Sequence, residues 1–150
     1  MRTNQDFRDL FAAFNAAGVE FLVVVGHALA AHGHVRATKD IDILVRCDAL
    51  NAARTHRAIR AFGAPVGDLM VEDLATPGIV FQIGVPPIRI DILTTITGVT
   101  FDEAWGARVA SQYDDQPIHV LSREHLIQNK RATGRLQDLA DVERLEKGLE

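Results

Sequence analysis

Two aspartates separated by one isoleucine, Asp40 and Asp42, are the residues of this sequence best placed to do chemistry. They belong to the apolar segment DIDILV, which has the composition of a buried strand. Because side chains alternate between the two faces of a strand, both carboxylates lie on the same face. Like charges there repel unless water solvates them, they share a proton, or they hold a cation. We interpret the pair as a cation site, with two exposed acids at a strand start as the alternative.

A third aspartate, Asp91, lies in a second apolar segment, IRIDIL. The isoleucines there alternate with Arg89 and Asp91, so these two residues share one face of the strand. A carboxylate at that position is costly to bury without a partner. The partner is either a metal ion shared with the first pair or a salt bridge to Arg89 or Arg36. Carboxylates that bridge two Mg²⁺ ions about 3.5–4 Å apart can neutralise a triphosphate and stabilise leaving pyrophosphate.

A glycine turn precedes the aspartate pair. Gly26 follows the apolar strand Phe21 to Val25, and a short alanine-rich helix from about His27 to His32 comes next. The turn directs backbone N–H groups and a helix N-terminus at one region, which is the environment that a phosphate requires. The basic loop that follows contains Arg36 and Lys39, which are candidates for contact with phosphate or acceptor. A carboxylate metal site beside a phosphate cradle indicates nucleotide chemistry.

Helical and strand patterns alternate through the rest of the chain, without a repeat or a low-complexity linker. In the first half of the chain we expect a helix ending near Gly18, the strands Phe21 to Val25 and Asp40 to Val45, and a helix over Ala49 to Phe62 capped by Asp48. A loop with a short helix over 64–77 and strands on both sides of Pro86-Pro87 come next. In the second half we expect a short helix from Phe101 to Ala107, a hairpin over 109–121, and helices from Ser122 to about Ala132 and from Arg135 towards Leu149. This order predicts a single α/β or α+β domain.

Composition limits the class of protein. The chain has 150 residues, 47% of them hydrophobic, which suits one domain with a substantial core. A net charge of −4 argues against broad, non-specific binding to nucleic acid, although it allows a local contact with an RNA end. The single cysteine, Cys47, excludes an internal disulfide and fits a reducing compartment. Because no apolar run reaches 18 residues, we expect a cytoplasmic protein with no membrane span.

The combination of Gly26, Asp40-Ile41-Asp42 and Asp91 resembles the signature of the DNA polymerase β-like nucleotidyltransferase superfamily. The chain is similar to small stand-alone bacterial nucleotidyltransferases, including types related to toxin–antitoxin systems, in the segments VVVGHALAAHGHVRATKDIDILV, FQIGVPPIRIDIL and LIQNKRATGRLQDLADVERLE. The resemblance implies a mixed β-sheet flanked by helices, with a C-terminal helical segment. It implies one domain over 1–150, with a catalytic core over about 19–95 and a C-terminal hairpin and helices over about 101–149.

The resemblance also implies a reaction. A nucleoside monophosphate passes from an NTP such as ATP to an acceptor hydroxyl, pyrophosphate leaves, and two Mg²⁺ ions, or Mn²⁺, are held by Asp40, Asp42 and Asp91. The acceptor is a protein, the 3′ end of an RNA such as tRNA, or a small molecule such as an antibiotic. Few residues remain to bind it, so a partner protein or a second copy in a homodimer is expected to contribute. The alternative is a catalytically weak nucleotide-binding or toxin–antitoxin module that acts through a partner; a DxD glycosyltransferase is a weaker alternative because it leaves Gly26 unexplained.

Two phosphate contacts follow from the resemblance. His27 stands where the superfamily usually has a second glycine or a serine, so it either donates a hydrogen bond to a phosphate or crowds it. Basic residues of the C-terminal helices are implied to hold the triphosphate, and Lys130 is the first candidate. We interpret Asp138 and Asp141 differently, as members of ordinary surface pairs with basic residues three or four positions away.

Overall fold

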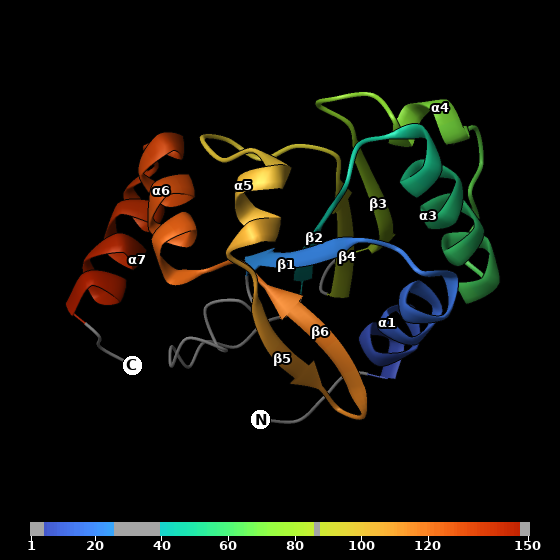
Figure 1. The fold of residues 1–150 in the computed structure, drawn as a ribbon, viewed down its shortest axis with the longest axis horizontal. Helices are drawn as coiled ribbons and strands as arrows, with labels where there is room; N and C mark the ends of the chain where they lie inside the picture. Colours follow the sequence, from blue (N-terminus) through green and yellow to red (C-terminus); the bar gives the residue numbers. More distant parts are fainter. Residues whose placement is uncertain (1–4, 26–39, 86–87, 148–150) are drawn as a thin grey trace.

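The strands form one six-stranded mixed sheet, which the computed structural model describes together with its helices over residues 5–25, 40–85 and 88–147 (Figure 1). The strands are β1 (Phe21–Val25), β2 (Asp40–Val45), β3 (Val80–Val85), β4 (Ile88–Leu93), β5 (Val109–Tyr113) and β6 (Gln116–Val120). The described helices are α1 (Gln5–Ala17), α3 (Ala49–Phe62), α4 (Val71–Leu74), α5 (Phe101–Gly106), α6 (Arg123–Thr133) and α7 (Leu136–Lys147). This mixture of helices and strands confirms the predicted fold class.

The strand order β3-β4-β2-β1-β6-β5 combines local and distant pairings. The pairs β1 with β2, β3 with β4 and β5 with β6 join strands that follow each other in the chain, and all three are antiparallel. The pairs β2 with β4 and β1 with β6 are parallel and join strands that are distant in sequence. These two distant pairings connect the three local ones into a continuous sheet.

One face of the sheet packs against α1 and α3, which lie together at one side of the molecule (Figure 1). Ile41 and Ile43 of β2 point into this core. The ring of Phe11 stacks on that of Phe21 with centroids 5.9 Å apart. The apolar residues of α1 recur at helical spacing, and all are buried: Phe7, Leu10, Phe11 and Phe14.

The opposite face packs against α5, α6 and α7, which lie on the other side of the sheet (Figure 1). Its core contains Leu22 and Leu44 from the two central strands, together with Leu126 of α6 and Leu145 of α7. Because Ile41 and Ile43 point towards α1 and α3, the alternating position Asp42 belongs to this second face.

Helix ends are fixed by local signals. The Asp48 side chain accepts a hydrogen bond from the backbone N–H of Asn51 at 2.7 Å, and Gly63 ends α3 with a φ of 96°. Ser122 caps α6 in the same way, and Gly134 ends it with a φ of 70°. The predicted bounds of α3 are therefore confirmed. Within the described residues, no helix has the length and apolar character needed to cross a membrane.

Candidate active site

Asp42 and Asp91 lie side by side on neighbouring strands. Strands β2 and β4 run parallel, and their register places the Cα of Asp42 opposite that of Asp91. Residues opposite each other in such a pair point to the same face. The flanking Ile41 and Ile90 point into the core under α1 and α3, so both carboxylates point to the face covered by α5, α6 and α7. The sheet thus brings together two acids that are far apart in sequence.

The two carboxylates are withdrawn from water to different extents. Asp91 is 8% exposed, whereas Asp42 is half-buried with its Oδ1 atom covered. Arg89 shares the face of Asp91, and its Nε atom lies 3.1 Å from Asp91 Oδ1. The salt bridge considered from the sequence is therefore present. Because burial of a charged carboxylate is costly, the nearby guanidinium offsets part of that cost.

Several predicted site residues lie outside the described part of the chain. Gly26, His27, Arg36 and Lys39 belong to the range 26–39, so their roles as phosphate or acceptor contacts stay predictions. The backbone of Asp40 is described as the first residue of β2, with Arg89 as its register partner. Its side chain lies outside the description, so its role as a metal ligand also stays a prediction.

Lys130 lies inside a buried ion-pair network between α6 and α7. The residue is 4% exposed, and its Nζ atom lies 3.0 Å from Asp138 Oδ1 and 3.5 Å from Asp141 Oδ2. Thr133 and Arg135 each donate a hydrogen bond to Asp138 Oδ2 at 2.6 Å. The structure thus gives Lys130 carboxylate partners, and its predicted contact with a triphosphate stays untested.

The network corrects one prediction. Asp138 and Asp141 are 2% and 4% exposed, so they are not surface residues. They occupy the same helical face as Val142 and Leu145, at spacings of three, four and seven residues, and this face packs on α6. That alignment with apolar residues is the signal in the sequence that could have revealed their burial.

The same network holds Asp138 in its charged form. Burial by itself raises the pKa of Asp138, but hydrogen bonds from Thr133, Arg135 and Lys130 outweigh burial and lower the pKa to about 2. The carboxylate is therefore ionised at neutral pH and balances Lys130 inside the helix pair. The network contributes to the stability of this part of the molecule.

The donor set on the second face fits a hard divalent cation. Aspartate oxygens are the ligands that Mg²⁺ prefers, and the register of Asp42 and Asp91 places two carboxylates next to each other. Among the side chains that the structure describes, no group of three or more His, Cys, Asp and Glu residues is arranged to hold a metal ion. The third predicted ligand, Asp40, is outside that set, so the described residues supply two carboxylates of the predicted three.

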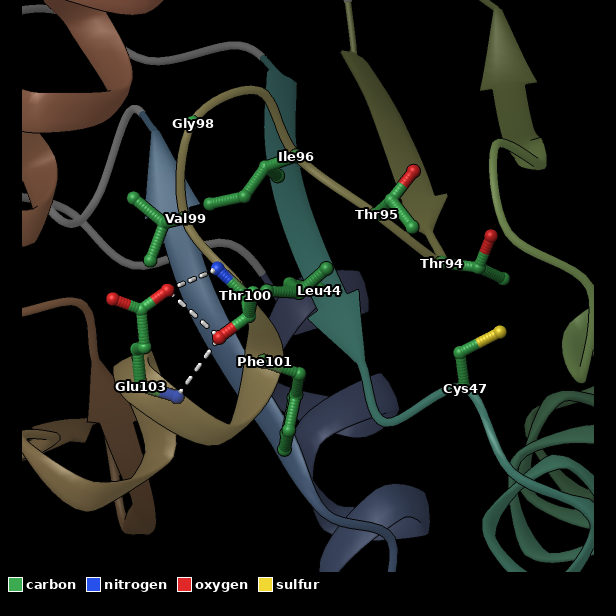
Figure 2. A pocket seen from close by; sticks show the side chains of 10 residues that line it. All are labelled: Leu44, Cys47, Thr94, Thr95, Ile96, Gly98, Val99, Thr100, Phe101 and Glu103. Atoms are coloured by element: carbon green, nitrogen blue, oxygen red, sulfur yellow. Dashed lines mark hydrogen bonds between the residues drawn. The ribbon is translucent and has the colours of Figure 1, made fainter.

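A pocket of about 460 Å³ opens on the same face of the sheet, and the sequence did not predict it. Figure 2 shows its walls, which come from the end of β2 and Cys47 just after it, the loop that follows β4, and the start of α5. It is lined by Leu44, Cys47, Thr94, Thr95, Ile96, Gly98, Val99, Thr100, Phe101 and Glu103. The lining combines segments separated by about 50 residues, and no local pattern indicates such a combination.

Comparison with known proteins yields matches among solved structures alone. No protein-family model matches the chain, and no curated protein matches it. The lincosamide antibiotic adenylyltransferase LnuA, solved with bound lincomycin, is similar with a TM-score of 0.60 and 15% identity, over 96% of each chain. A candidate nucleotidyltransferase from Thermotoga maritima has a TM-score of 0.61 and 17% identity, over 95% of this chain and 89% of that one. Identities this low establish the fold, and the chain therefore has the nucleotidyltransferase fold.

Proposed function

We propose that this protein is a metal-dependent nucleotidyltransferase, which transfers a nucleoside monophosphate from an NTP to an acceptor hydroxyl. The observation that carries the proposal is the register of β2 and β4, which places Asp42 opposite Asp91 on one face of the sheet. The nucleotidyltransferase fold supports it, because a paired-carboxylate site on this fold suits phosphoryl chemistry.

The proposed reaction forms one bond to phosphorus and breaks another. The acceptor oxygen forms a bond to the α-phosphorus, the bond from that phosphorus to the oxygen bridging to the β-phosphate breaks, and pyrophosphate leaves with the electron pair. Asp91 accepts the hydroxyl proton on its carboxylate. Together with Asp40 and Asp42 it would also hold Mg²⁺ or Mn²⁺, and that ion would neutralise charge on the phosphates. The acceptor is a protein, an RNA end or a small molecule, and the antibiotic named for LnuA supports the last of these.

A second function is favoured by one observation. Arg89 places a positive charge 3.1 Å from Asp91, so that carboxylate is neutralised without a metal ion. A nucleotide-binding module that works through a partner protein, with little or no turnover, needs only such a compensated site. Turnover distinguishes the two functions, whereas nucleotide binding does not.

The test is transfer from each of the four α-labelled NTPs, with Mg²⁺, into tRNA, lysate protein, the protein itself and small hydroxyl compounds. Asp42→Asn and Asp91→Asn are expected to lower transfer by more than about 100-fold, because several kcal/mol of transition-state stabilisation depend on the metal ligands. Asp68→Asn removes the same charge from an exposed position and should leave transfer unchanged. Full activity in Asp42→Asn would refute the proposed site. Binding of magnesium–NTP without any transfer would support the binding module.

A further inference from the structure

We propose that the pocket behind Leu44 and the loop 94–100 binds the acceptor, and that this acceptor is a small molecule with an apolar body and a neutral or positively charged polar group. The role of this ligand as acceptor depends on the proposed nucleotidyl transfer. The binding site itself rests on the pocket alone.

The position of the pocket places it next to the candidate carboxylates. Leu44, which lines the pocket, follows Asp42 by two residues on β2 and lies on the same face of the sheet. Two residues of a strand span about 6.6 Å. A molecule seated against Leu44 can therefore extend a hydroxyl towards Asp42 and its neighbour Asp91.

The lining suits an apolar ligand. The pocket surface is mostly apolar, and Leu44, Ile96, Val99 and Phe101 are among the residues that line it (Figure 2). The Thr95 hydroxyl accepts a hydrogen bond from the backbone N–H of Gly78, so its own hydrogen is available for a ligand. A volume of about 460 Å³ lies in the usual range of about 300–1,000 Å³ for small-molecule sites. Such sites are mostly apolar, with a few polar groups that orient the ligand.

The charge of the pocket argues against the nucleotide as its occupant. None of the ten lining residues, all of which the structure describes, is Lys, Arg or His. The charged side chain among them is Glu103, whose pKa is lowered by hydrogen bonds from the side chain and the backbone N–H of Thr100. A triphosphate or an RNA end requires cationic or N–H donors, and a carboxylate repels both. A neutral or cationic ligand does not meet this repulsion.

The pocket is preformed. Gln128 and Asn129 of α6 donate hydrogen bonds to the carbonyl oxygens of Gly98 and Thr97, at 2.5 and 2.9 Å. Thr100 and Glu103 hold each other in a capping box at the start of α5, which the dashed lines of Figure 2 mark. The loop over the pocket is thus held at both its middle and its end, so a ligand does not have to order it.

The first experiment uses two probes that share a phenol ring and differ in the sign of their charge. Tyramine is cationic and 4-hydroxyphenylacetate is anionic. Titrated into nucleotide-free protein, tyramine is expected to shift the methyl NMR resonances of Leu44, Ile96 and Val99, and the anion should bind at least ten-fold more weakly. Absence of tyramine binding, tighter binding of the anion, or shifts confined to other residues would overturn the inference.

Matched variants test the charge. Glu103→Gln keeps an oxygen that can accept the capping hydrogen bonds from Thr100 but removes the carboxylate, so the preference for tyramine should fall to less than about three-fold. Asp102→Asn removes one charge from the adjacent position, which does not line the pocket, and should retain the preference. An unchanged preference in Glu103→Gln would contradict the role given to its charge.

A second pair of variants tests occupancy. Thr95 lines the pocket, and Thr97 lies in the same loop outside the lining. Thr95→Phe is expected to weaken tyramine binding at least ten-fold and Thr97→Phe to leave it unchanged, with circular dichroism melting as the check that both variants fold. Equal binding by the two variants would overturn the inference.

Probe binding and label transfer together distinguish a failure of this inference from a failure of the proposed function. Probe binding needs no nucleotide, so a protein that binds tyramine at the pocket but transfers no label would retain the site and lose the function. If label is transferred, Thr95→Phe should reduce transfer to small acceptors at least ten-fold. Labelling of protein or RNA that is insensitive to Thr95→Phe would show that the acceptor binds elsewhere.

Discussion

At the scale of single residues, either of two positive charges can balance Asp91 of the candidate site. One is the Arg89 guanidinium, and the other is a bound divalent cation. The guanidinium Nε lies 3.1 Å from Asp91 Oδ1, and Asp91 is nearly buried. A divalent cation bound at the same carboxylate would compete with Arg89 for it. We therefore expect Arg89 to stabilise the metal-free protein and to weaken the metal binding proposed for this site.

Replacing Arg89 by methionine tests this competition. We expect Arg89→Met to lower the free energy of unfolding by about 1–2 kcal/mol without metal, because the buried Asp91 carboxylate loses its ion pair with Arg89. The rise in melting temperature on adding Mg²⁺ or Mn²⁺ should be larger than in the wild type, since the metal no longer competes. Arg57→Met, at an exposed position of α3, is the control. An equal metal-induced rise in Arg89→Met and wild type would contradict the competition.

At the scale of elements, α6 and α7 are held together by the charged network of Lys130, Asp138 and Asp141 as well as by apolar contacts. Breaking a buried ion pair from one side is costly because the remaining charges stay buried without compensation. The short connection at Gly134 brings the two helices together and makes this network possible.

Lys130→Met is expected to lower the free energy of unfolding by about 3 kcal/mol, since Asp138 and Asp141 lose their shared cation. Arg131→Met is the matched control, because Arg131 pairs with Glu146 at the surface, where such pairs are worth about 0–1 kcal/mol. Denaturant unfolding measures both. A loss of stability no larger in Lys130→Met than in Arg131→Met would show that the buried network contributes little.

The pH dependence of stability should report the same network. The pKa of Asp138 falls from 3.8 to about 2 on folding, so the folded state favours the ionised form. Its contribution, on the order of 2 kcal/mol, is fully present above about pH 4 and is lost as the pH falls towards 2. Unfolding of the wild type and of Asp138→Asn, measured between pH 2 and 6, should therefore show a stability difference that shrinks on acidification. A constant difference would contradict the lowered pKa.

At the scale of the whole molecule, the loop 94–100 joins the sheet to the C-terminal helices. Gly98 has a φ of +81°, and a Cβ atom at this position would lie 2.6 Å from the Cβ of Ala132 on α6. The loop and α6 also share two hydrogen bonds, from Gln128 and Asn129. These contacts join the loop after β4 to α6, and the single domain over 1–150 stays a prediction.

Gly98→Ala should destabilise the protein by about 1–3 kcal/mol, because alanine is strained at this φ and its methyl group collides with Ala132. Ala132→Gly should remove the collision but not the strain. The double variant is therefore expected to recover at least about 0.5 kcal/mol relative to the sum of the two single changes. Strict additivity in denaturant unfolding would show that Gly98 and Ala132 do not interact.

The sequence by itself determined the local structure of this protein. Helix bounds such as Ala49–Phe62 follow from a capping aspartate and a terminal glycine, which act within a few residues. The alternation along IRIDIL likewise placed Arg89 and Asp91 on one face, as the ion pair confirms. The sequence also indicated a candidate cation site, because few arrangements other than a bound cation or an ion pair stabilise closely spaced carboxylates in apolar strands.

Only the tertiary structure decided which distant segments meet. The parallel register that sets Asp42 opposite Asp91 depends on how the whole sheet is assembled, because strands distant in sequence can pair in several orders. Burial of Asp138 and Asp141 depends on the packing of α7 against α6, whereas their spacing alone equally suits a solvated face. The pocket is likewise built from the end of β2, the loop after β4 and the start of α5. Contacts of this kind are set by the packing of the whole chain, so no short stretch of sequence encodes them.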